Sequence, residues 1–213
     1  MTPVAERSIE SVVAGYYCRA LSRHGPTHRG VDWSTQESQE LRFATLLDGI
    51  DWSGRPTLLD FGCGYGALAE HLDDLGVDCD YVGYDIAPAM IDAARRSYRD
   101  RDDRRFTADA ISLQRADFVV ASGVFNVKLD IPRSSWTTYV GATIAQLGSL
   151  TRRRLSFNML PAASAPELER EDLYYSNPGA VVRYCRATVG GPVELREDYG
   201  LWEFTVLASP AGA

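Results

Sequence analysis

The sequence has few cysteines, little positive charge and no long hydrophobic run, and each scarcity excludes a class of protein. The four cysteines are scattered with no Cys-x-x-Cys pair, so we expect neither a disulfide framework nor a metal site. No apolar stretch approaches the roughly 18 residues of a membrane span. The N-terminal segment also lacks the apolar core of a signal peptide. These absences predict a soluble, cytoplasmic protein without a membrane partner.

The charge balance argues against a nucleic-acid partner. The chain has 22 basic and 29 acidic residues, a net charge of −7. Such a field repels phosphate backbones. The length of 213 residues favours one domain, because two halves would each be close to the smallest size that holds a good core. No pattern indicates an oligomeric state.

What is present, from residue 55 onward, is an alternation of short apolar runs and helical patterns. Helical patterns lie between apolar runs that we expect to be strands, at residues 57–61, 80–84, 105–107, 117–121 and 155–160. Two further runs, 193–196 and 202–207, have only a tight turn between them and must be antiparallel. The pattern predicts an α/β protein. We expect a Rossmann-like, doubly wound, mostly parallel seven-stranded sheet that ends in an antiparallel hairpin.

Residues 1–54 precede the first predicted strand and form two helical patterns. The first pattern covers residues 4–22. The second begins where Ser34 stands three residues before Glu37, a capping-box signature. We therefore expect one domain, residues 1–213, with a helical lid at 1–54 over a Rossmann-like core at 55–213.

A glycine-rich turn, Asp60-Phe61-Gly62-Cys63-Gly64-Tyr65-Gly66, joins the first strand to a helix. Glycines allow positive φ and let a ligand approach the backbone closely. The spacing also satisfies the loose GxGxxA fingerprint, so an NAD(P) oxidoreductase is an alternative. Asp60, however, would repel a pyrophosphate and would suit the sulfonium and ammonium groups of S-adenosylmethionine.

Carboxylates also follow the next two strands. Asp85 ends the second strand, where it can accept hydrogen bonds from both ribose hydroxyls or cap the helix after it. Ile86 and Met90 would then flank the adenine ring. Asp109, followed by Ala110, is placed to accept from the adenine amino group, with an ordinary turn residue as the alternative.

The segment LLDFGCGYGAL, together with these later carboxylates, resembles class I S-adenosylmethionine-dependent methyltransferases. The resemblance covers roughly residues 55–207, including the terminal hairpin. It implies that the glycine turn holds the methionyl part of the cofactor, that Asp85 holds the ribose and that Asp109 holds adenine. Segments such as HGPTHRGVDW and SGVFNVKLD also resemble a small bacterial subgroup without an assigned substrate.

Three lid residues are further candidates for the cofactor. Gln39 and Arg42 are three apart on one helix face, and Arg42 suits the methionyl carboxylate. Trp33 lies in the loop before them. A solvated helix face is the alternative.

Polar residues after the fourth strand are candidates for the acceptor side, because ligands of open α/β sheets bind at the strands' carboxyl ends. We assign Ser122 to the cofactor and Asn126 to orienting the acceptor, with a turn residue as the alternative for Asn126. Tyr175 is a candidate acid, base or pocket wall, or a packing residue. The segment after this strand has no Asn-Pro-Pro-aromatic or Pro-Cys sequence, which argues against methylation of adenine, glutamine amide or cytosine C5.

The predicted activity is transfer of the cofactor's methyl group to a small molecule by in-line displacement. This chemistry depends on positioning and needs no catalytic triad. Two alternatives keep the cofactor: a cyclase or lyase that releases methylthioadenosine, and a non-catalytic cofactor-binding module.

Overall fold

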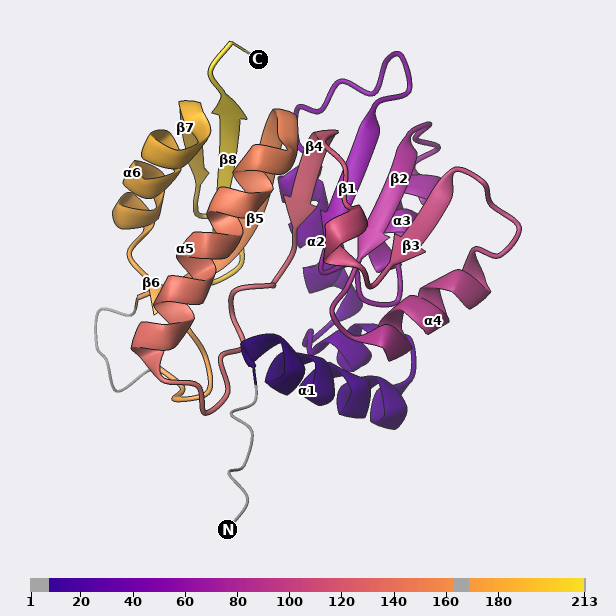
Figure 1. Cartoon of the computed structure of the whole chain (residues 1–213), viewed down its shortest axis with the longest axis horizontal. Helices are drawn as coiled ribbons and strands as arrows, with labels where there is room; N and C mark the ends of the chain where they lie inside the picture. The colour runs from indigo at the N-terminus through magenta and orange to yellow at the C-terminus, as the bar shows by residue number, and fades with distance from the viewer. Residues whose placement is uncertain (1–7, 163–168, 213) are drawn as a thin grey trace.

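A mostly parallel sheet forms the centre of the computed structural model, which describes residues 8–162 and 169–212 (Figure 1). The strands follow the order β3-β2-β1-β4-β5-β8-β7. β8 is antiparallel to both β5 and β7, which confirms the predicted terminal hairpin. A short additional strand, β6, pairs with β5 outside this order. The bounds are β1 Thr57–Phe61, β2 Asp80–Tyr84, β3 Arg104–Thr107, β4 Ala116–Ala121, β5 Thr151–Pro161, β6 Tyr175–Ser176, β7 Gly190–Arg196 and β8 Phe204–Pro210.

Helices cover both faces of this sheet. Successive side chains of a strand point to opposite faces, and Leu58 and Leu59 accordingly belong to different hydrophobic clusters. The Leu58 cluster includes residues of α2 (Gln36–Leu47), α3 (Ala67–Asp74) and α4 (Pro88–Ser97). The Leu59 cluster includes residues of α5 (Arg133–Leu150) and α6 (Pro178–Val189), the two helices in front of the sheet in Figure 1. The predicted doubly wound fold is confirmed.

The segment that we predicted to be a lid precedes β1. It contains α1 (Ile9–His24), the short 3-10 helix η1 (His28–Val31) and α2, while the predicted start of the first helix lies outside the described residues. α1 crosses the end of the sheet at which the parallel strands terminate (Figure 1). Strand carboxyl ends are where open α/β sheets bind ligands. The lid therefore lies over the edge where a site is expected.

Element boundaries differ from the sequence-based expectations at several places. The cap of α2 is Thr35, whose Oγ1 accepts from the Ser38 amide at 3.1 Å, and not Ser34. The helix begins one residue later than the capping-box pattern suggested, so Thr35 has the spacing that reaches an unpaired amide. β5 also begins earlier than predicted: it starts at Thr151, whereas the apolar run predicted a strand at residues 155–160. Among the helices that the structure describes, none has the length and apolar character to cross a membrane.

Candidate functional site

The glycine turn after β1 has a conformation that side chains rarely adopt. φ is 86° at Gly62, 55° at Gly64 and 93° at Gly66. A Cβ on Gly62 would lie 2.5 Å from Val124 Cγ2, so the turn also touches the segment after β4. The amides of Gly62 and Cys63 both donate to the Tyr84 carbonyl, at 2.7 and 2.9 Å. These bonds fix the turn against the end of β2.

Asp85 joins the glycine turn to the segment before α4. Its Oδ2 accepts from the Gly64 amide at 2.9 Å, and its Oδ1 accepts from the Ala87 amide at 2.8 Å. The residue is buried, and this burial raises the pKa of its carboxyl to about 6 because the charged form loses solvation. Asp85 is thus a buried acid fixed by main-chain donors.

Asp60 is a second buried acid at the same edge of the sheet. Its Oδ2 accepts from the Tyr81 hydroxyl at 2.6 Å. Burial raises the pKa of Asp60 to about 7, although the hydrogen bond from Tyr81 acts in the opposite direction. Two carboxyls therefore lie at the ends of adjacent strands, β1 and β2.

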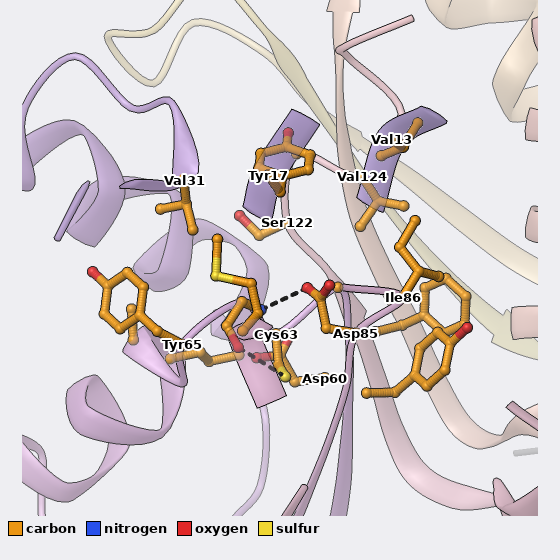
Figure 2. Close-up of a pocket in the computed structure, with 18 of the residues that line it drawn as sticks. Val13, Tyr17, Val31, Asp60, Cys63, Tyr65, Asp85, Ile86, Ser122 and Val124 are labelled. Atoms are coloured by element: carbon orange, nitrogen blue, oxygen red, sulfur yellow. Dashed lines mark hydrogen bonds between the residues drawn. The ribbon is translucent and has the colours of Figure 1, made fainter. Parts of the chain in front are cut away.

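A cavity opens between the lid and this edge of the sheet (Figure 2). In Figure 2, Asp85 lies between Val31 and Tyr65 on one side and Ile86 and Val124 on the other. The cavity brings together most of the residues predicted for the cofactor, namely Trp33, Gln39, Asp60, Gly62, Cys63, Gly64, Asp85, Ile86, Met90 and Ser122. The Ser122 Oγ is buried and has no hydrogen-bond partner.

Three residues predicted for the cofactor, Arg42, Asp109 and Ala110, lie outside the cavity lining. Arg42 turns its guanidinium toward Glu203, with Nε 2.8 Å from Oε2, and stacks on the Trp33 ring at 4.0 Å. Asp109 instead accepts from the Ile111 amide at 2.9 Å and caps a 3-10 turn, η2 (Ala110–Ser112). Asp109 lines a separate surface hollow beside α4. Asp109 therefore caps a local turn and Arg42 forms a long-range ion pair, whereas the sequence assigned both side chains to the cofactor.

The two residues predicted for catalysis also lie outside the cavity lining. Asn126 is buried, and its Oδ1 has no partner. Its main-chain carbonyl accepts from the Tyr174 amide at 2.8 Å, which ties it to the loop before α6. Tyr175 is buried, accepts from the Arg170 amide at 3.1 Å and contacts the Trp202 ring.

Sequence reasoning missed the aromatic part of the cavity. Tyr17 comes from α1, Tyr84 from β2, and Trp136 and Tyr139 from α5. The helical periods of α1 and α5 were visible, and Trp136 and Tyr139 are three apart on one face. Which helix faces meet across a cavity depends on how the helices dock, and no local pattern encodes that.

Comparisons with known proteins agree with this arrangement. A family model described as "Methyltransferase domain" matches residues 59–140. The chain is 41% identical over 152 residues to "Putative methyltransferase Rv1506c" of Mycobacterium tuberculosis, which covers 71% of this chain and 92% of that protein. The chain is a class I S-adenosylmethionine-dependent methyltransferase.

Solved methyltransferase structures show the same fold. One is magnesium protoporphyrin IX methyltransferase from Synechocystis, with a TM-score of 0.64 at 17% identity, covering 95% of this chain and 96% of the other. Another is 1,6-didemethyltoxoflavin-N1-methyltransferase from Burkholderia thailandensis, with a TM-score of 0.64 at 16% identity and coverage of 98% and 93%. At these identities the likeness concerns the fold.

The cavity of the methyltransferase fits its cofactor, S-adenosylmethionine. The charged residues among the described cavity lining are Asp60 and Asp85, with no lysine, arginine or histidine. The cofactor brings two positive groups and one carboxylate, which an acidic cavity favours. The unpartnered Ser122 Oγ adds a free hydrogen-bonding group, since buried polar atoms normally have partners.

Proposed function

We propose that this methyltransferase transfers the cofactor's methyl group to a small molecule, within a single domain. When bound, the cofactor supplies a sulfonium methyl, which an acceptor's lone pair takes by in-line displacement while the carbon–sulfur electron pair stays on sulfur. The observation that carries the proposal is the cavity's position between the lid and the carboxyl ends of β1, β2 and β4. A covered cavity favours a small acceptor over an extended polymer.

The residues of the chain have distinct tasks in this proposal. The Asp85 carboxylate accepts from the ribose hydroxyls, and Ile86 and Met90 flank the adenine. The glycine turn leaves space for the methionyl part, because Gly62 and Gly64 line the cavity and carry no Cβ. Trp33 and Gln39 cover that part from the lid. Acceleration comes mainly from holding the two reactants in line and away from water.

Two fold neighbours support a small acceptor. One acts on a porphyrin and the other on a toxoflavin precursor, as their names state, and the second was crystallised with that precursor. Both acceptors are small molecules. The net negative charge of this chain is also unfavourable for a nucleic-acid acceptor.

Product analysis tests the proposal. The protein is incubated with S-adenosylmethionine and either the small-molecule or the macromolecular fraction of a cell extract. We expect S-adenosylhomocysteine to form with the small-molecule fraction and to disappear in Asp85→Ala, while exposed Asp92→Ala keeps activity. Methylthioadenosine as the product would indicate internal attack on the methionyl chain. Transfer only to the macromolecular fraction would overturn the small-molecule assignment.

The proposal also predicts that the lid closes over the bound cofactor. Val13, Tyr17, Val31, Trp33, Gln39 and Phe43 line the cavity from α1, α2 and the segment between them. We expect cofactor binding to slow amide exchange in residues 8–47 as well as in the glycine turn. Slower exchange confined to residues 62–85 would contradict a closing lid.

A further inference from the structure

The cavity has an unusual charge pattern for an enzyme that must bind a second substrate. Its described lining contains two carboxyls and no basic side chain. Arg42 lies on the Trp33 ring but is paired with Glu203, which is almost fully buried. The Arg42 charge is therefore balanced on the side away from the cavity. No group in the described lining can neutralise an anion.

One wall of the cavity is aromatic. Tyr17, Tyr84, Trp136 and Tyr139 line it and belong to, or pack against, the same hydrophobic cluster. The Trp136 Nε1 donates to the Phe125 carbonyl at 2.9 Å, so the indole has a fixed orientation and its polar atom is satisfied. The wall thus offers ring surfaces from α1, α5 and the end of β2.

The four wall residues are not among those assigned to the cofactor. The glycine turn, Asp85, Ile86 and Met90 are used for the cofactor, and Val13 and Val124 continue the apolar surface beyond Ile86 (Figure 2). Among the described residues, the Tyr17 hydroxyl has no hydrogen-bond partner. It is free to meet a polar atom on a bound ring.

The acidic groups and the aromatic wall of the cavity disfavour an anionic ligand and favour a neutral or cationic aromatic ring. Burying a carboxylate or phosphate beside two carboxyls without a counter-ion is strongly unfavourable. A neutral aromatic ring gains stacking and edge contacts with the wall, and a cationic one adds attraction to ring faces. The cofactor's positive charge offsets part of the cavity's negative charge, but it is lost on methyl transfer.

We infer that the methyl acceptor is an aromatic molecule without negative charge, held between α1 and α5 against Tyr17, Trp136 and Tyr139. This inference rests on the proposed small-molecule function and narrows it. It assigns the acceptor subsite to the aromatic wall, whose residues carry no assigned cofactor contact.

Three matched probes test the inference without requiring that any of them be methylated. They are 2-phenylethylamine, 2-phenylethanol and 3-phenylpropionate, which share a ring and a two-carbon linker but carry positive, zero and negative charge. Binding to protein saturated with S-adenosylhomocysteine is measured by saturation-transfer NMR titration near neutral pH. We expect the amine and the alcohol to bind at least about tenfold more tightly than the carboxylate, a difference of roughly 1.4 kcal/mol.

A charge introduced into the wall should reverse this preference. Tyr139 lines the cavity from α5, whereas the neighbouring Thr138 is exposed. We expect Tyr139→Lys to improve binding of 3-phenylpropionate several-fold and to weaken binding of the amine. The matched variant Thr138→Lys adds the same charge to the same helix and should leave all three affinities unchanged.

The outcomes separate this inference from the proposed function. If S-adenosylhomocysteine binds and 3-phenylpropionate binds as well as the amine, the charge assignment is overturned while the methyltransferase function stands. If the cofactor product binds and none of the three rings binds, the aromatic subsite is overturned. If Tyr139→Lys and Thr138→Lys have equal effects, the subsite does not lie at α5. Failure of S-adenosylhomocysteine itself to bind would instead contradict the proposed function.

Discussion

The two sides of the cavity are held in place by different kinds of contact. On the sheet side, main-chain amides of the glycine turn donate to Asp85 and Tyr84, which lie only 21 or 22 residues further along the chain. On the lid side, Arg42 reaches Glu203 across a separation of 161 residues. A Cβ on Gly123 would lie 2.5 Å from the Trp33 ring, so the lid also packs closely on the segment after β4.

This difference predicts different behaviour on mutation. The sheet side is part of the core and should remain formed without the lid's ion pair. The lid is joined to the rest of the chain by long-range side-chain contacts: α2 packs in the Leu58 cluster, Val13 of α1 packs in the Leu59 cluster, and Arg42 pairs with Glu203. Changes in the two regions should therefore affect stability and cofactor affinity to different extents.

The largest expected effect is on stability, from breaking the ion pair of the lid. Arg42→Met leaves the buried Glu203 carboxylate without its cation, and we expect the free energy of unfolding to fall by about 3–5 kcal/mol. Urea denaturation measures this change. The double variant Arg42→Met/Glu203→Gln removes the unpaired charge and should recover part of the loss. A loss below about 1 kcal/mol is the scale of an exposed ion pair, and it would contradict a buried ion pair between Arg42 and Glu203.

The next largest expected effect is a pH dependence of the free energy of unfolding, caused by Asp60 on the sheet side of the cavity. The pKa of Asp60 is raised from 3.8 to about 7 by burial, so the folded protein keeps a proton that the unfolded chain has lost. Its contribution to the free energy of unfolding is fully present below about pH 4 and decreases as pH rises toward 7, by on the order of 2–4 kcal/mol. Denaturation of the cofactor-free protein between about pH 4 and pH 8 tests this.

Asp60→Asn is the matched variant for this measurement. An amide of the same shape does not titrate, so the decrease between these pH values should become smaller. The same slope in Asp60→Asn and in the wild type would assign the pH dependence to other groups.

A third prediction concerns cofactor affinity on the sheet side. Asp85→Ala removes an acceptor that holds the Gly64 amide and faces the cavity. We expect S-adenosylhomocysteine to bind more weakly by roughly 1.5–3 kcal/mol, the scale of charge-assisted hydrogen bonds. Calorimetry on the folded variant measures it, with Asp92→Ala as an exposed control. Unchanged affinity in Asp85→Ala would remove the ribose assignment.

The smallest expected effect is at Asp109. Its carboxylate is exposed, caps η2 and lies outside the cavity lining. We expect Asp109→Ala to weaken cofactor binding by less than about 1 kcal/mol, since an exposed hydrogen bond contributes little. A loss equal to that of Asp85→Ala in the same calorimetric titration would mean that the adenine reaches this loop.

The sheet and the glycine turn could be predicted because their signals are local. Residues 57–61 and 80–84 are apolar runs with the length of buried strands, and both are strands with those bounds. Asp85 follows its strand directly, so its place beside the turn is a consequence of βαβ geometry. The hairpin was also predictable, because two strands without a helix between them must be antiparallel.

The partners of long side chains could not be predicted in the same way. Arg42 was assigned to a ligand carboxylate, but a carboxylate near the C-terminus takes it. Asn126 follows its strand as expected, but its main-chain carbonyl accepts a hydrogen bond from the Tyr174 amide, in the loop before α6. Both outcomes depend on residues far away in the chain, and a local pattern carries no information about them.

By itself the sequence determined the alternation of parallel strands and helices that ends in an antiparallel hairpin, the glycine turn, and the acids at the ends of β1 and β2. These depend on backbone geometry and on polarity over a few residues. Only the tertiary structure decided that α1 and α5 supply an aromatic wall and that Arg42 pairs with Glu203. Those features result from how whole helices dock and from which buried charge a guanidinium must neutralise.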